Sequence, residues 1–171
     1  MVQQSISGVD AMGYYLTAQV CGNGHHTTSS VEHSPNLMAN FCDKCGSETM
    51  TKCPSCSTKI RGKYYVDDFA IIGQNYTAPS FCHACGKAFP WTTTKIEAAK
   101  EMVEEIDELS PDEREKLKGA IDDIVIEGAR TELGANRFKK LLTKMGSASA
   151  SAMRDIVVDV ISETAKKIIF P

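Results

Sequence analysis

The sequence predicts an α+β fold in two domains, a small β-rich module at residues 1–93 and an α-helical bundle of about four helices at residues 94–171. Two observations lead to this prediction. Before Trp91, short runs of β-forming residues alternate with Gly, Asn, Ser and Pro, whereas the apolar residues after it recur at helical spacing. In addition, four closely spaced pairs of cysteine or histidine side chains punctuate the first half of the sequence.

Three runs in the first domain have the composition of β-strands. They are YYLTAQV at 14–20, TKIRGKYYV at 58–66 and FAIIG at 69–73. Turn-forming residues separate them. We therefore expect short strands joined by turns around little apolar core, so that the module needs a further source of stability to offset its chain entropy.

The second domain shows the apolar periodicity of successive amphipathic helices. Apolar residues at i, i+3 and i+4 spacing predict a first helix over 96–109. The sequence SPDE at 110–113 predicts the start of a second, with Ser as N-cap, Pro at the first helical position and Glu at the third. Thr131 is expected to cap a third helix, and an apolar stripe over 153–169 predicts a fourth.

All seven cysteines and one histidine fall into pairs with the spacing of metal ligands. Three pairs are Cys-x-x-Cys and the first is Cys-x-x-Gly-His. Thiolate and imidazole ligands suit tetrahedral Zn²⁺, and eight of them make two closed sites. Such ligation contributes on the order of 10 kcal/mol to folding. We therefore expect two structural Zn²⁺ ions, held by Cys21, His25, Cys42, Cys45, Cys53, Cys56, Cys82 and Cys85.

The order of the pairs predicts which ligands share an ion. Sequential pairing assigns the first two pairs to one ion and the last two to the other, so that each pair lies at a hairpin turn, as in a zinc ribbon. Interleaved pairing stays open at this point, because only seven residues separate Cys45 from Cys53. His26 is the alternative to His25 as the eighth ligand, and iron is the alternative to zinc in the all-cysteine site.

The number of ligands also argues against an enzyme. A catalytic zinc keeps one position open for water or substrate, whereas eight ligands for two ions leave none. The zinc-deaminase pattern needs His-x-Glu before Pro-Cys-x-x-Cys, and here the proline lies inside the pair CPSC at 53–56. The sequence shows neither the βαβ context of a thioredoxin-type pair nor a Gly-rich phosphate loop. We therefore expect a non-enzymatic zinc-binding protein.

Charge and targeting signals restrict the possible partners. The formal net charge of −3 comes from residues after 94, because the first 94 carry six basic and six acidic side chains. Proteins that bind phosphate backbones tightly carry an excess of basic side chains, and this charge balance shows no such excess. No segment approaches the ~18 apolar residues of a membrane span, and the N-terminus lacks a secretory pattern. We expect a cytoplasmic protein without membrane contact, an unidentified protein partner and, as an option, a homodimer through the C-terminal helices.

One segment of the first domain has the residue types of a partner-binding surface. Residues 52–63 carry four basic side chains and no acidic one, and two tyrosines follow. The simplest interpretation is an exposed strand whose lysines protect its edge. The alternative is a nucleic-acid-binding zinc-ribbon regulator that uses this strand. The candidate partner-binding residues are Lys59, Arg61, Lys63, Tyr65 and, if its indole is exposed near the domain junction, Trp91.

Several short motifs, taken in their order, add a family resemblance. They are CGNGH at 21–25, FCDKCG at 41–46, CPSC at 53–56, IRG at 60–62, FCHACG at 81–86, FPW at 89–91 and ETAKKII at 163–169. Together they resemble an uncharacterised bacterial family of small cytoplasmic proteins with N-terminal tandem zinc-ribbon-like knuckles and a helical C-terminal region. The resemblance implies metal binding and a cytoplasmic location, and it supplies no activity. We expect an adaptor or regulatory component that acts through protein contacts.

Overall fold

The computed structural model describes residues 13–66 and 75–171 and divides into two compact units between Phe89 and Pro90. The first unit contains short antiparallel strands and two cysteine-rich clusters, and the second contains the helices α1 to α5. The α+β fold class is therefore confirmed. The predicted strand at 69–73 lies outside the described residues.

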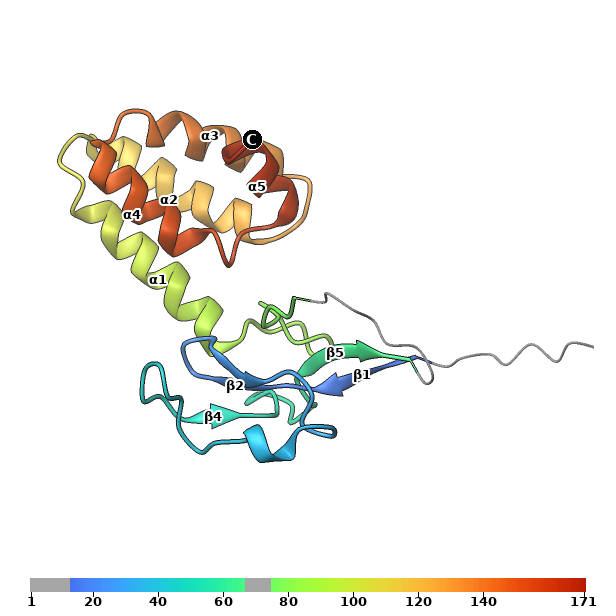
Figure 1. Cartoon of the computed structure of the whole chain (residues 1–171). Helices are drawn as coiled ribbons and strands as arrows, with labels where there is room; N and C mark the ends of the chain where they lie inside the picture. Colours follow the sequence, from blue (N-terminus) through green and yellow to red (C-terminus); the bar gives the residue numbers. More distant parts are fainter. Residues whose placement is uncertain (1–12, 67–74) are drawn as a thin grey trace, which may run out of the picture. The chain divides into compact units, whose positions relative to one another are not determined.

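The described strands of the first unit form two small antiparallel sheets (Figure 1). One sheet pairs β1 (Tyr14–Thr17) with β5 (Arg61–Tyr65). In the other, β2 (Gln19–Cys21) lies between β3 (His26–Thr28) and β4 (Thr49–Met50). A 3-10 turn, η1, spans Pro35–Leu37. The single predicted run at 14–20 thus contributes to both sheets, and the Ala18 amide between them donates to the Ile60 carbonyl at 2.9 Å.

Few large apolar side chains are buried in the described part of the first unit. Leu16, Val20, Ile60 and Phe89 are among them, together with the first cysteine of each ligand pair. An apolar core of this size offsets little chain entropy. A metal ion bound by the cysteine clusters would add stability that this small core does not supply.

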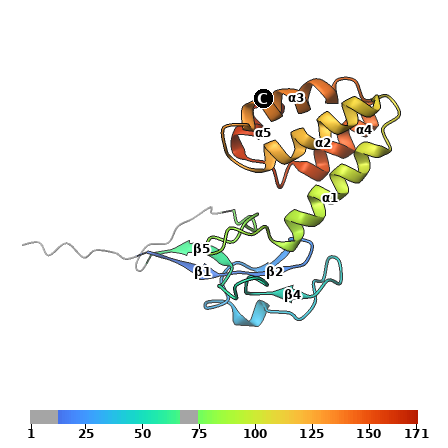
Figure 2. The ribbon, with the colours of Figure 1, turned by 180° about the vertical axis from the view of Figure 1, so that it is seen from behind.

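The second unit consists of five helices. They are α1 (Pro90–Glu104), α2 (Pro111–Val125), α3 (Thr131–Leu142), α4 (Ser147–Val157) and α5 (Glu163–Ile169). Helix α3 packs against α2 and α5, whereas α1 packs against α2 and α4 (Figures 1 and 2). None of these helices, nor any other in the described residues, is both long and apolar enough to cross a bilayer.

Helix α2 begins as its sequence predicts. The Ser110 hydroxyl accepts a hydrogen bond from the Glu113 amide, and the Glu113 carboxylate accepts one from the Ser110 amide, with Pro111 between them. Helix α3 differs from the prediction, because its N-cap is Arg130 and not Thr131. The Thr131 hydroxyl instead donates to the Ile126 carbonyl and accepts from the Gly128 amide, so that it fixes the preceding loop.

The apolar stripe at 153–169 forms two helices rather than one continuous helix. Helix α4 ends at Val157, and α5 begins at Glu163. Its N-cap is Ser162, whose hydroxyl accepts a hydrogen bond from the Ala165 amide. The Ser162 amide donates to the Ile124 carbonyl at 2.8 Å, which anchors the corner to the end of α2. This corner directs α5 onto α3, where the Lys139 ammonium donates to the Ile168 carbonyl.

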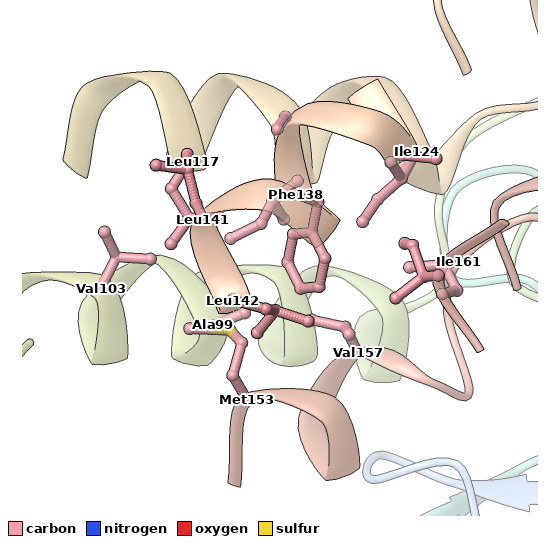
Figure 3. Close-up of a cluster of buried hydrophobic side chains, with 14 of the residues drawn as sticks. Ala99, Val103, Leu117, Ile124, Phe138, Leu141, Leu142, Met153, Val157 and Ile161 are labelled. Carbon is pink, nitrogen blue, oxygen red and sulfur yellow. The ribbon is translucent and has the colours of Figure 1, made fainter. Parts of the chain in front are cut away.

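The helical unit has a continuous apolar core of its own. Side chains from α1, α2, α3 and α4 converge on the ring of Phe138, which is fully buried (Figure 3). Ile106 and Leu109, which the periodicity placed on the first helix, lie beyond its end and are still buried. The Arg114 guanidinium donates twice to the Ile106 carbonyl and holds this turn in place.

Candidate metal centres

The three Cys-x-x-Cys pairs form hairpin turns, here called knuckles, with the same hydrogen bonds. In each knuckle the amide of the first cysteine donates to the carbonyl five residues later, at 2.8–2.9 Å. The amide four residues after the first cysteine donates back to that cysteine's carbonyl, at 2.8 Å. A bridge between the flanking residues closes each turn, at Phe41–Glu48, Lys52–Lys59 and Phe81–Ala88.

Each knuckle needs one residue in the left-handed region of backbone space. Gly46 and Gly86 occupy this position with φ of 71° and 72°, where glycine carries no steric cost. In the middle knuckle the position is taken by Ser57, with φ of 60°. The three turns therefore share a backbone conformation although only two of them contain the glycine that indicates it in the sequence.

The remaining pair, Cys21 and His25, lies on a different turn between β2 and β3. The Cys21 amide donates to the His25 carbonyl and the Gly24 amide donates to the Cys21 carbonyl, both at 2.9 Å. Gly24 has φ of 87°, which permits this tight reversal. The turn places the His25 ring beside the Cys21 thiol, with Nδ1 3.7 Å from Sγ.

Sheet pairing brings this turn to the first knuckle. Cys21 pairs with Thr49 in the β2–β4 ladder, and the Gly22 amide donates to the Glu48 carbonyl at 3.1 Å. The Asn23 side chain also donates to the Ser47 hydroxyl. As a result, the ligand atoms of Cys21, His25, Cys42 and Cys45 all lie within 4.8 Å of one another.

The second group joins the two remaining knuckles. The sulfurs of Cys53 and Cys85 are 3.9 Å apart, and those of Cys56 and Cys82 are 3.6 Å apart. The four ligand atoms again lie within 4.8 Å of one another. The structure thus brings the predicted ligands together in sequential order, and the interleaved alternative does not match the observed grouping.

Distances within both groups fit a tetrahedral metal site. A Zn–S bond of about 2.3 Å places tetrahedral sulfurs about 3.8 Å apart, and the measured sulfur–sulfur contacts range from 3.6 to 3.9 Å. A disulfide would require a separation of about 2.05 Å, and all seven cysteines are free. Both groups can therefore hold a metal ion with four protein ligands.

Local hydrogen bonds favour the thiolate form of two ligands. Contacts with the Ser47 side chain and amide lower the pKa of the Cys45 thiol to about 5. Contacts with the Thr58 side chain and amide lower the pKa of the Cys56 thiol to about 6. Metals bind the thiolate and not the thiol, so these donors lower the proton competition at Cys45 and Cys56. At Cys85 a hydrogen bond from the Lys87 amide acts in the same direction, but desolvation and the neighbouring thiols together raise the pKa of the Cys85 thiol to about 11.

The other histidines lie outside both groups. His26 is exposed and its ring contacts that of Tyr76, edge to face at 5.1 Å between centroids. Partial desolvation of its ring, with Lys44 and Lys63 nearby, lowers the pKa of His26. His33 contacts the ring of Tyr65 at 4.6 Å, and His83 is exposed within the last knuckle. Of the two candidates for the eighth ligand, the structure therefore places His25 in the group.

The predicted partner-binding residues do not form a single surface. Arg61 and Lys63 line one cavity together with Tyr15 and Tyr64. Tyr65 does not line this cavity; it pairs with Tyr14 in the ladder, and the two rings meet edge to face at 5.5 Å between centroids.

Lys59 and Trp91 do not line this cavity. Lys59 lines an adjoining cavity that also contacts Tyr15 and Arg61, and its ammonium is 3.5 Å from the Glu32 carboxylate. Trp91 lies in the first turn of α1 and is only 4% exposed, so that it offers no exposed indole. Its inclusion among the partner-binding candidates is corrected accordingly. The sequence analysis missed Tyr15, because nothing in its local motif relates it to a strand 46 residues later.

The fold and the two ligand groups define a class of protein: a small α+β chain with two four-ligand Cys/His groups that could hold metal ions and a separate helical unit. A family model described as "Uncharacterized protein conserved in bacteria (DUF2321)" matches residues 14–169. The chain belongs to this family, which confirms the resemblance inferred from its motifs. Neither the curated proteins nor the solved structures with which the chain was compared provide a match.

Proposed function

We propose that this protein is a non-enzymatic zinc-binding protein that acts through protein contacts, as an adaptor or regulatory component. The observation that carries the proposal is the pair of complete four-ligand groups. A structural zinc site is closed by four protein ligands, whereas a catalytic site leaves one position for water or substrate. Two closed sites would hold the first unit in shape and leave its surface available for binding.

The donor atoms support zinc as the bound metal. The first group combines one imidazole nitrogen with three sulfurs, and the second has four sulfurs. Zn²⁺ accepts both sets in tetrahedral geometry. Seven free cysteines also suit a reducing cytoplasm, in which thiols persist. We therefore assign two structural Zn²⁺ ions, and the alternative of iron in the all-cysteine group would be visible as a coloured protein.

An exposed apolar segment beside the first knuckle supports a protein partner. Leu37, Met38 and Phe41 are 52%, 43% and 64% exposed within five residues of chain. Large apolar side chains grouped on a surface commonly mark protein-interaction sites. Phe41 directly precedes the ligand Cys42 and forms the bridge that closes the knuckle. Metal binding would therefore hold this aromatic ring in a fixed position.

Replacement of the metal by Co²⁺ tests whether the groups are closed. We expect the full-length protein to bind two Co²⁺ ions with the intense visible absorption of tetrahedral thiolate coordination. Because no ligand position is open, addition of azide or imidazole should leave this spectrum unchanged. A shift of the bands on adding either ligand would reveal an open position and contradict a purely structural role.

Affinity capture from the native host tests the protein contact. The baits are the wild-type chain, Phe41→Ser, and Leu133→Ser as a control at an exposed apolar residue of the helical unit. We expect a protein that the wild-type and Leu133→Ser baits retain and Phe41→Ser loses, with metal content unchanged in all three. Equal recovery by all baits would contradict the assignment of this surface. A homodimer through the C-terminal helices stays a prediction, which sedimentation equilibrium checks.

A further inference from the structure

Pairing of β1 with β5 assembles exposed tyrosines that are distant in the sequence. Tyr15 lies opposite Tyr64 in the ladder, and their ring centroids are 5.1 Å apart. Tyr15 is 51% and Tyr64 is 39% exposed. The Arg61 guanidinium lies over the Tyr15 ring, 4.6 Å from its centroid. One face of this two-stranded sheet thus presents aromatic rings and a cation side by side.

A cavity adjoins these rings. It has a volume of about 420 Å³ and is lined by Tyr15, Tyr64, Arg61, Lys63 and Tyr76, among others. Its wall on the Tyr76 side is fixed, because the Tyr76 hydroxyl donates to the Arg61 carbonyl at 2.9 Å. No acidic side chain lines the cavity in the described residues. The cavity therefore suits a ligand that has both a planar apolar ring and a negative charge.

A second cavity continues this surface toward the last knuckle. It has a volume of about 260 Å³ and shares Tyr15 and Arg61 with the first, and its lining adds Lys59 and His83. Glu32 is the carboxylate that pairs with Lys59, and it is held by two hydrogen bonds from Thr17. Because they share Tyr15 and Arg61, the two cavities form a track lined by both cations and aromatic rings. Such a track matches a repeating ligand better than a single small molecule.

We propose that this track, here called the Tyr15 surface and made of Lys59, Arg61, Lys63, Tyr15, Tyr64, Tyr76 and His83, binds single-stranded nucleic acid. Unpaired bases stack on exposed aromatic rings, and nearby Lys and Arg side chains neutralise the phosphates. The bases of a duplex stack on one another, so their faces are not available to the tyrosine rings. An acidic peptide would pair with the cations but would not stack on the rings. Both fit the surface less well. The inference goes beyond the protein-contact role and gives the adaptor a second ligand.

The charge of the whole chain limits the strength expected of this binding. The formal net charge is −3 and the bound thiolates would add to it. Three cations on the track would contact about three phosphates, for which affinity falls with salt at a slope of about −2 on logarithmic axes. We therefore expect micromolar binding that weakens about 10- to 20-fold between 50 and 200 mM salt.

Fluorescence anisotropy with labelled thymidine and uridine 20-mers tests the proposal on the full-length, metal-loaded protein. The single strands should bind, and a duplex of equal length should bind at least about tenfold more weakly. Tyr15→Ala and Arg61→Ala should each weaken binding about tenfold, whereas Tyr15→Phe should retain it because the ring face is unchanged. If Tyr15→Ala fails to fold, Tyr64→Leu tests stacking in its place, because it removes an aromatic ring but keeps the apolar bulk.

Two matched controls separate stacking from general attraction. Tyr14→Ala removes an equally exposed tyrosine from the other face of the same strand, and Lys140→Ala removes a cation from the helical unit. Both should bind as the wild type does. Metal analysis and near-ultraviolet circular dichroism of every variant distinguish a lost surface from a lost zinc site.

Four results would overturn the proposal. The first is no saturable binding of either strand by the metal-loaded protein, and the second is equal affinity for single strand and duplex. The third is equal loss in Tyr15→Ala and Tyr14→Ala. Binding of polyglutamate in place of the oligonucleotides would also count against it, because it would indicate an acidic protein ligand.

Discussion

The Sγ atoms of Cys53 and Cys85 lie 3.9 Å apart although 32 residues separate them in the chain. Closing a loop of this length has an entropic cost, and a small unit with few buried apolar side chains has little to offset it. A metal ion shared by two knuckles would offset that cost directly. The same argument applies to Cys21 and Cys45, whose sulfurs are 3.7 Å apart across 24 residues.

Removal of the metal should therefore unfold the first unit and leave the second folded. The helical unit has a continuous buried core around Phe138 and contains none of the ligands. Amide NMR spectra of the full-length, reduced protein before and after chelation measure this. We expect signals of residues 13–66 to collapse to random-coil positions while those of 90–171 keep their dispersion. Unchanged dispersion in the first unit after complete metal loss would contradict the structural role.

Ser57→Gly should stabilise the metal-loaded first unit. Ser57 has φ of 60°, a conformation that costs an L-residue about 1 kcal/mol and glycine almost nothing. The converse change, Gly86→Ala, should destabilise by a similar amount, because the position has free space but φ of 72°. Thermal unfolding at fixed zinc concentration measures both. If Ser57→Gly lowered the midpoint, the common backbone conformation of the knuckles would be in doubt.

Two glycines of the helical unit should respond to alanine in opposite directions. Gly119 lies inside α2 with open space around a new Cβ, so Gly119→Ala should stabilise by about 0.5–1 kcal/mol. At Gly134 in α3 a Cβ would meet the Asp123 Cβ at 2.6 Å, so Gly134→Ala should destabilise through a forced shift of α3 against α2. Urea unfolding of the two variants gives the comparison, and neither should alter the zinc content.

Glu32→Gln should destabilise the first unit by about 1 kcal/mol at neutral pH, a figure reduced for the exposure of the pair. Partial burial alone would raise the pKa of Glu32, but hydrogen bonds from the Thr17 hydroxyl and amide, with Lys59 nearby, lower it to about 2. Because the folded pKa lies below the ordinary 4.5, this contribution is complete above about pH 5 and is lost as the pH falls toward 2.

The difference between Glu32→Gln and the wild type should accordingly stay constant from pH 8 to pH 6, as measured by thermal unfolding at several pH values. Glu48→Gln, at an exposed carboxylate of the same unit, is the control and should change stability by less than about 0.5 kcal/mol. A difference that grew or vanished within this pH range would show that the Glu32 carboxylate titrates there and is not held as described.

The sequence predicted the ligand grouping because ligand spacing and hairpin turns are local properties. The pairs, the glycines at 46 and 86 and the capping box at Ser110 all depend on residues within five positions of one another. Helix periodicity likewise predicted the buried face of 153–169. It did not predict the corner at Ser162, because the contact that anchors this corner comes from Ile124 in another helix.

Long-range strand pairing was the part that the sequence could not supply. The composition of 58–66 indicated a strand, but its partner, β1, was not specified by any local pattern. The Tyr15 surface depends on that pairing. The sequence therefore predicted only its cations Lys59, Arg61 and Lys63, and not the tyrosines beside them. For the same reason the exposure of Trp91 was not predictable, since burial of an aromatic residue depends on what packs against it in three dimensions.

Elemental analysis of the reduced, purified full-length protein tests the central claim most directly. Two zinc ions per chain are expected, falling to one when Cys85→Ser disrupts the second group and the first group stays intact. A preparation with no stoichiometric transition metal, or one in which Cys85→Ser leaves both ions bound, would contradict the account.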